Sequence, residues 1–112
     1  MDFSVRTVRL YNYLCEEMRE YVMSKQLLRS GTSIGANAHE AHNAQSDREF
    51  IAKMYIALKE ATETEFWIEL LIRTDYLSMQ QGDSIQGDCV ELKKILTTII
   101  KSAKARMQKG PQ

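Results

Sequence analysis

Two histidines and three closely spaced carboxylates are the residues that could do metal or acid–base chemistry in this chain. His39 and His42 are one residue too close for the zinc-binding pattern His-Glu-x-x-His, and no third ligand matches them. Paired carboxylates such as Glu60, Glu63 and Glu65 could bind a metal or transfer protons. However, di-iron helical bundles need Glu-x-x-His on two helices, and that signature is absent. We therefore expect no metal site and no cofactor.

The sequence offers no nucleophile for covalent catalysis either. Cys15 and Cys89 fall on apolar stripes, where cysteine usually behaves as a small hydrophobic residue, and no histidine is near either of them in sequence. The glycine-bearing run 30–38 could cradle a phosphate, but no lysine follows Gly35 as it would in a P-loop. Because no nucleophile, base and orienting group can be assembled, we expect no catalytic residues and no enzymatic activity.

The same glycine-bearing run favours a structural role. Gly31, Gly35 and Ala38 would let another helix approach closely, with hydrogen bonds made across the contact. Arginine forms bidentate pairs with carboxylates, and such networks fix the register of helices more than they stabilise them. We therefore predict a structural polar network between helices, made of Arg29, Ser33, Asn37, Glu60 and Glu63.

Hydrophobic spacings of three and four predict the elements that carry these residues. The only proline is Pro111, and four stretches show helical periodicity, at about 4–22, 24–44, 47–76 and 84–107. Ser46 and Glu49 fit a capping box that opens the third helix. The segment 80–83 is the expected loop before the fourth. Four amphipathic helices with short connections predict an all-α, antiparallel up-down-up-down four-helix bundle, with a single domain over 1–108 and a flexible tail over 109–112.

The inward positions follow from the same spacing. On the first helix they are Val5, Val8, Tyr11, Leu14 or Cys15, Met18 and Val22. On the third and fourth helices they form regular apolar stripes, from Phe50 to Leu71 and from Ile85 to Ala103.

Composition bounds the class of protein. The chain has 112 residues, with 15 Lys and Arg against 15 Asp and Glu, so one globular domain is expected. Zero net charge argues against coating nucleic acid by bulk electrostatics but permits a local basic patch. Two cysteines are too few for a secreted disulfide framework, and no apolar run approaches the roughly 20 residues of a membrane span. These features, with no signal peptide at the start, predict a cytoplasmic protein that does not contact membranes.

Several segments resemble a known bacterial family. They are residues 26–37 (QLLRSGTSIGAN), Glu40-Ala41, Ser46 with Phe50, and residues 56–67 (IALKEATETEFW). They resemble the four-helix-bundle proteins encoded in intervening sequences of 23S ribosomal RNA genes, also labelled S23 ribosomal proteins, to which the accessory proteins of diversity-generating retroelements are related. The resemblance implies an antiparallel bundle that assembles as a homopentamer, has no enzymatic activity, and binds nucleic acid or a nucleic-acid-processing partner such as a reverse transcriptase.

The segment 66–72 independently favours self-association. Six of its seven residues are apolar, which covers far more of a helix than the single stripe needed inside a small bundle. A monomer would expose a large apolar patch unless this were its most central helix. We therefore predict a subunit interface at Phe66, Trp67 and Leu70.

A cluster of basic residues marks the fourth helix. Residues 90–112 contain six Lys and Arg against one Glu, a net charge of +5. A helical wheel places the lysines opposite the core, where they would contact phosphates or simply be solvated. Binding of RNA or DNA through this face and a purely protein-interaction scaffold are the two functions left open. The predicted nucleic-acid-binding residues are Lys93, Lys94, Lys101, Lys104 and Arg106.

Overall fold

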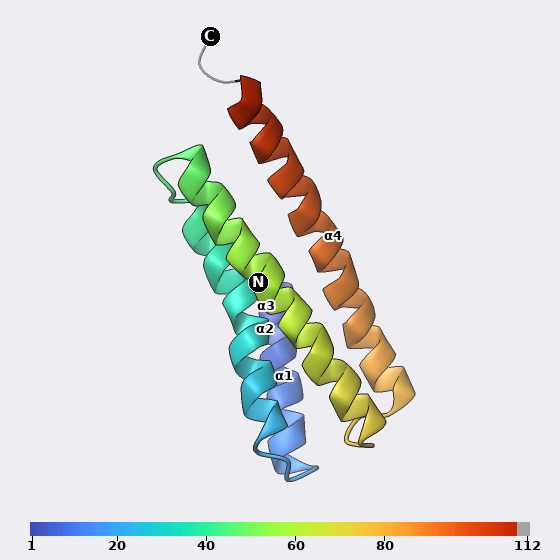
Figure 1. Cartoon of the computed structure of the whole chain (residues 1–112). Helices are drawn as coiled ribbons and strands as arrows, with labels where there is room; N and C mark the ends of the chain where they lie inside the picture. Colours follow the sequence, from blue (N-terminus) through green and yellow to red (C-terminus); the bar gives the residue numbers. More distant parts are fainter. Residues whose placement is uncertain (110–112) are drawn as a thin grey trace.

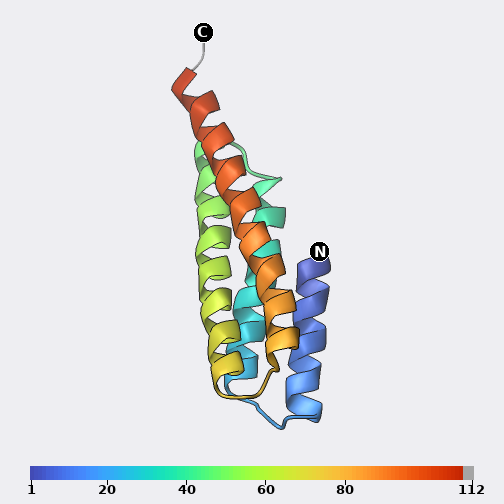
Figure 2. The same cartoon turned by 90° about the vertical axis from the view of Figure 1, so that its right-hand side faces the viewer.

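The protein is an all-α bundle of four helices joined by short connections. The computed structural model describes residues 1–109, and successive helices run in opposite directions along the bundle (Figures 1 and 2). This confirms the predicted all-α fold. Of the predicted tail, Lys109 is the last helical residue, and residues 110–112 lie outside the described residues. The helices are α1 (Asp2–Glu16), α2 (Met23–Ala41), α3 (Asp47–Arg73) and α4 (Met79–Lys109).

The third helix is the centre of the packing. α3 packs extensively against both α2 and α4, whereas α1 packs mainly against α2 and barely touches α4. Figure 2 shows that α1 covers only part of the bundle, since its N-terminus lies partway along α4. The other end of the 57 × 21 × 19 Å rod therefore consists of α2, α3 and α4 alone.

The apolar stripes of α3 and α4 form most of the core, as their spacing predicts. Their buried members lie three, four or seven residues apart, so they share one helix face. Phe50, Leu58, Leu92 and Ile99 from the same stripes are partly buried against them. The buried members of the predicted stripes are Met54, Ala57, Ala61, Ile68 and Leu71 on α3, and Ile85, Cys89, Leu96 and Ala103 on α4.

The inward face predicted for the first helix is wrong at its valines, whereas Leu14 is buried and Met18 packs against the core as predicted. Val5 and Val8 are 42% and 41% exposed, whereas the polar Thr7 is fully buried. The burial of Thr7 is possible because its hydroxyl donates to the carbonyl oxygen of Phe3, at 2.8 Å. The buried face of α1 therefore runs through Thr7 and Leu14, and the valines that gave the apparent stripe face outward.

The predicted close approach of helices at Gly31 and Gly35 is confirmed. A Cβ atom at Gly31 would lie 2.5 Å from Cγ2 of Thr7, and one at Gly35 would lie 2.7 Å from Oγ of Ser4. The helix that crosses α2 here is α1. Because neither glycine has a side chain, the two backbones approach more closely than other residues would allow.

The first helix ends six residues earlier than the sequence predicts. α1 ends at Glu16, and the chain turns at Arg19, which has a φ of 53° in the left-handed region. The nearly buried carboxylate of Glu20 then accepts hydrogen bonds from the backbone N–H groups of residues 22, 23 and 24, at 2.7–3.0 Å. These are donors that the first turn of α2 would otherwise leave without partners. Glu20 thus stabilises the start of a new helix at a place where the periodicity predicts a continuous one. Val22, predicted to face inward, is 76% exposed in this connection.

The start of α3 follows the predicted capping box closely. The hydroxyl of Ser46 accepts from the backbone N–H of Glu49 at 3.1 Å. The carboxylate of Glu49 reaches back to the N–H of Gln45 at 3.1 Å, one residue before the position that the motif predicts. α3 ends at Arg73 rather than 76, and Asp75 follows it with a φ of 66°.

The loop predicted over residues 80–83 is wrong, because these residues form the first turn of α4. Ser78 accepts from the N–H of Gln81 at 3.1 Å, and the Gln81 side chain accepts from the N–H of Ser78 at 3.0 Å. This is a second capping box, with glutamine in the third position. Gly82 is buried in this turn against α3. A side chain would not fit there, because a Cβ atom would lie 2.3 Å from the side chain of Ile72. The glycine thus serves helix packing instead of a turn.

Candidate nucleic-acid interface

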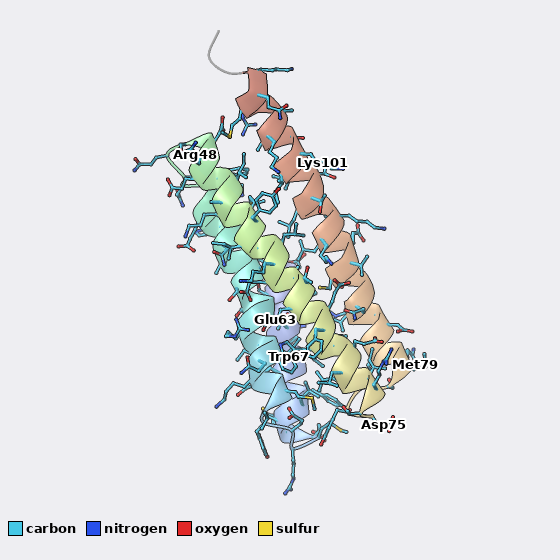
Figure 3. All side chains as sticks on the ribbon, in the orientation of Figure 1. Arg48, Glu63, Trp67, Asp75, Met79 and Lys101 are labelled. Carbon is cyan, nitrogen blue, oxygen red and sulfur yellow. The ribbon has the colours of Figure 1, made fainter. Side chains whose placement is uncertain are left out.

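The five basic residues predicted to bind nucleic acid do not share one open face. Lys94 and Lys101 are exposed on α4, and Figure 3 labels Lys101 on the part of α4 that extends beyond α1. Lys93 instead lies partly buried between α3 and α4, where its ammonium pairs with the carboxylate of Glu65. The helical wheel placed Lys93 with the solvent-facing lysines, but it does not show where the neighbouring helix supplies a carboxylate.

The other two basic residues also contact α3. The ammonium of Lys104 donates to the hydroxyl of Tyr55 and lies 4.8 Å from the centroid of that ring. The guanidinium of Arg106 pairs with Asp47 at 3.0 Å. Lys94, Lys101 and Lys104 therefore present the exposed positive charge of this surface, which we call the basic face.

The charge of α4 is not neutralised by the helix beside it. Residues 90–109 carry six basic side chains against one acidic one, and α3 between residues 47 and 60 carries three of each. The antiparallel arrangement places these segments side by side (Figures 1 and 2). The excess of positive charge at this end therefore remains, although Asp47 and Glu65 each pair with one cation.

A polar network joins α2 to α3 and contains three of the five residues predicted for it. The guanidinium of Arg29 lies 3.2 Å from a carboxylate oxygen of Glu60 and also pairs with Glu63. The indole N–H of Trp67 donates to the same Glu63 carboxylate at 3.1 Å. Asn37 and Ser33 are not joined to this group. Asn37 donates to the carbonyl oxygen of Ser33 at 2.9 Å, within the same helix.

The three residues predicted to form a subunit interface differ in exposure, and Trp67 packs against the hydrophobic core. Phe66 is 56% exposed, while Trp67 and Leu70 are half-buried. The rings of Phe66 and Trp67 meet edge to face, with centroids 5.0 Å apart. Figure 3 labels Trp67 and Glu63 near one another on α3. Ile56, also on α3, is 42% exposed and was not among the predicted interface residues. Exposed apolar side chains on α3 therefore occur outside the segment 66–72 as well.

Cys89 is a buried thiol that keeps its proton. Burial and the charge of Glu65 raise the pKa of the Cys89 thiol, the charge of Lys93 lowers it, and together they bring this pKa to about 12. Cys89 is therefore a neutral thiol at physiological pH, and it donates to the carbonyl oxygen of Ala61. Within residues 1–109, no three His, Cys, Asp or Glu side chains are placed to hold a metal ion. None of the helices in that range has a long enough apolar stretch to cross a membrane.

An open groove lies where α1 leaves the space between α2 and α4 uncovered. It has a volume of about 1100 Å³ and is lined by both apolar and polar side chains. Near its rim, Arg6 of α1 pairs with Asp88 of α4. The groove was not predicted, because it exists only where α1 is shorter than its neighbours. Its lining includes Phe3, Ile34, His39, Leu92, Ile95 and Leu96.

Comparison with known proteins identifies a solved structure with the same fold and a matching family model. No curated protein matches the chain. A crystal structure of a protein of unknown function from the S23 ribosomal protein family of Bacteroides thetaiotaomicron VPI-5482 is 59% identical and superposes with a TM-score of 0.88. The similarity covers 89% of this chain and 93% of that one. The model of the family described as 23S rRNA-intervening sequence protein matches residues 1–98. The chain therefore belongs to the 23S rRNA-intervening sequence protein family.

Proposed function

We propose that this protein is a non-enzymatic, homo-oligomeric module that binds the backbone of RNA or DNA through its basic face. The observation that carries the proposal is the net charge of +5 over residues 90–109, which the facing half of α3 does not neutralise. Lysines contact phosphates as point charges and read base edges less selectively than arginine does. Binding through Lys94, Lys101 and Lys104 would therefore depend strongly on salt and weakly on sequence.

A salt titration of binding tests this proposal. We expect Lys94→Gln/Lys101→Gln to weaken binding to labelled RNA and DNA and to reduce the slope of log affinity against log salt by about 1 per lysine. Fluorescence anisotropy between about 50 and 200 mM salt measures both quantities. The matched control is Arg9→Gln/Lys25→Gln, which removes the same charge from exposed positions on α1 and α2. Equal slopes for the two variants, or no binding by the wild type at the lowest salt, would exclude the basic face.

We also propose that the exposed apolar surface of α3 joins subunits, and the family resemblance makes a pentamer the expected assembly. Light scattering of the 12.9 kDa chain at micromolar concentration measures the size of the particle. Because Phe66 is exposed and its hydrophobic contribution would come mainly from assembly, Phe66→Ser is expected to shift the particle towards monomer with an unchanged helical signal. A wild-type protein that scatters as a monomer would contradict the proposal. An oligomer that persists in Phe66→Ser would place the interface elsewhere.

A protein-interaction scaffold is the second candidate, and the groove between α1, α2 and α4 favours it. Apolar grooves between helices commonly receive an amphipathic helix of another protein. Under either function, the predicted cytoplasmic location and the predicted link to retroelement accessory proteins stay proposals. That link would make a reverse transcriptase a partner. Absence of salt-dependent nucleic-acid binding would favour the scaffold.

A further inference from the structure

An aromatic side chain lies open to solvent beside the basic face. Tyr55 of α3 is 43% exposed, although the ammonium of Lys104 lies over its ring. That ammonium also donates to the tyrosine hydroxyl, so Lys104 restricts the orientation of the Tyr55 side chain. The exposed fraction shows that part of this residue remains accessible to solvent.

Three lysines follow one side of α4, and one of them, Lys104, contacts this ring. Lys101 lies three residues before Lys104, so the two side chains are neighbours on α4, about 5–6 Å apart at their Cβ atoms. Lys94 lies about two helical turns before Lys101. A strand whose phosphates follow these ammonium groups would pass directly beside Tyr55.

Two of the three carboxylates on this half of α3 are paired with cations. Asp47 pairs with Arg106, and Glu60 pairs with Arg29. The Glu49 carboxylate accepts from a backbone N–H at the start of α3. The net field beside Tyr55 is therefore set by the lysines of α4.

An exposed ring next to phosphate-binding groups selects the strandedness of a nucleic acid. An unpaired base can stack on an aromatic side chain, and any base serves because every base has a flat face. Bases inside a duplex are already stacked and paired, so they cannot reach a ring on a helix surface.

We propose that Tyr55, with Lys101 and Lys104, forms a stacking site for an unpaired base of single-stranded nucleic acid. The inference rests on the proposed function and gives it a substrate class, single strands in preference to duplexes. Phe66 lies eleven residues further along α3, about 16 Å away. The inference requires an interface centred on Phe66, at this distance from Tyr55, because one that extends to Ile56 would cover the tyrosine ring.

The test compares single strands with a duplex in the same assay. Labelled 20-nucleotide oligo-U, oligo-dT and a 20-base-pair DNA duplex are titrated with wild type, Tyr55→Leu and Tyr55→Phe. Tyr55→Leu is expected to weaken binding of both single strands about tenfold and to leave duplex binding unchanged. Tyr55→Phe should stay close to wild type, because the ring is retained. Tyr21→Leu is the matched control, since Tyr21 is 58% exposed in the connection between α1 and α2.

Three outcomes would overturn the inference. If Tyr55→Leu binds single strands as well as the wild type does, or loses duplex binding equally, the ring does not stack on a base, while the proposed backbone binding stands. If Tyr55→Phe loses as much as Tyr55→Leu, the hydroxyl acts by positioning Lys104. If the wild type binds none of the three probes at about 50 mM salt, the stacking site and the proposed function fail together.

Discussion

Replacing Gly31 by alanine is expected to lower the free energy of unfolding by about 2–3 kcal/mol. Alanine is the better helix former by about 1 kcal/mol, so an open site would gain stability from this change. At Gly31 the added Cβ would instead lie 2.5 Å from Cγ2 and 2.8 Å from Oγ1 of Thr7. Thr7 is fully buried and its hydroxyl is bonded to the α1 backbone, so the backbones of α1 and α2 must separate.

Two further variants isolate the clash. Gly87→Ala makes the same exchange at a position on α4 where a Cβ would meet nothing within 4 Å, and it is expected to stabilise the protein by up to about 1 kcal/mol. Thr7→Ala/Gly31→Ala removes the two nearest side-chain atoms and should recover part of the loss. Urea denaturation followed by circular dichroism measures all four proteins. A Gly31→Ala variant as stable as Gly87→Ala would mean that α1 does not cross α2 at this point.

Replacing Glu20 by alanine is expected to cost about 2–3 kcal/mol at neutral pH. The side chain is 7% exposed, and its carboxylate accepts three backbone N–H groups at the start of α2. Hydrogen bonds to a charged acceptor are stronger than neutral ones, and alanine leaves these donors without a partner inside the protein. Glu16→Ala removes an exposed carboxylate from the end of α1 and should change stability by less than about 0.5 kcal/mol.

The contribution of Glu20 should also depend on pH. Burial raises the pKa of this carboxyl, but the hydrogen bonds from Met23, Ser24 and Val22 outweigh burial and lower the pKa below its ordinary value of 4.5. A lowered folded-state pKa gives stability that is present above the unfolded-state pKa and lost as the pH falls through the folded one. Denaturation at pH 7 and pH 3 should show the gap between wild type and Glu20→Ala narrowing in acid. A gap that is constant across this range would show that the carboxylate charge contributes nothing.

The sequence predicted the helices better than it predicted their ends. Periodicity is a property of one helix, so the stripes of α3 and α4 could be read without knowing the neighbours. The end of α1 depends on Glu20 reaching four residues ahead to Ser24, and an apolar pattern does not record that contact. Gly82 shows the same limit, because glycine marks both turns and close helix contacts. Only the Ser78 and Gln81 spacing distinguishes them, and it was readable as a capping box.

The candidate site was predictable as a charge excess but not as a surface. Counting residues finds the lysines of α4, while the pairing of Lys93 with Glu65 depends on the register between two helices far apart in sequence. The sequence did predict the group formed by Arg29, Glu60 and Glu63. An arginine between helices pairs well with carboxylates, because its planar guanidinium can donate to two of their oxygens. Tyr55 was missed, since nothing in its own neighbourhood distinguishes an exposed tyrosine from a core one.

The length of the bundle, combined with its distribution of charge, makes this electrically neutral protein an electric dipole. The end formed by residues 35–60 and 95–109 carries seven basic and four acidic side chains, and the remaining residues carry eight and eleven. Net charges of +3 and −3 are thus separated along a rod 57 Å long. In the field of a polyanion such a rod experiences a torque before any contact is made. It would turn with the C-terminal end of α4 leading (Figure 1), so the orientation of the first encounter is determined by the fold as well as by diffusion.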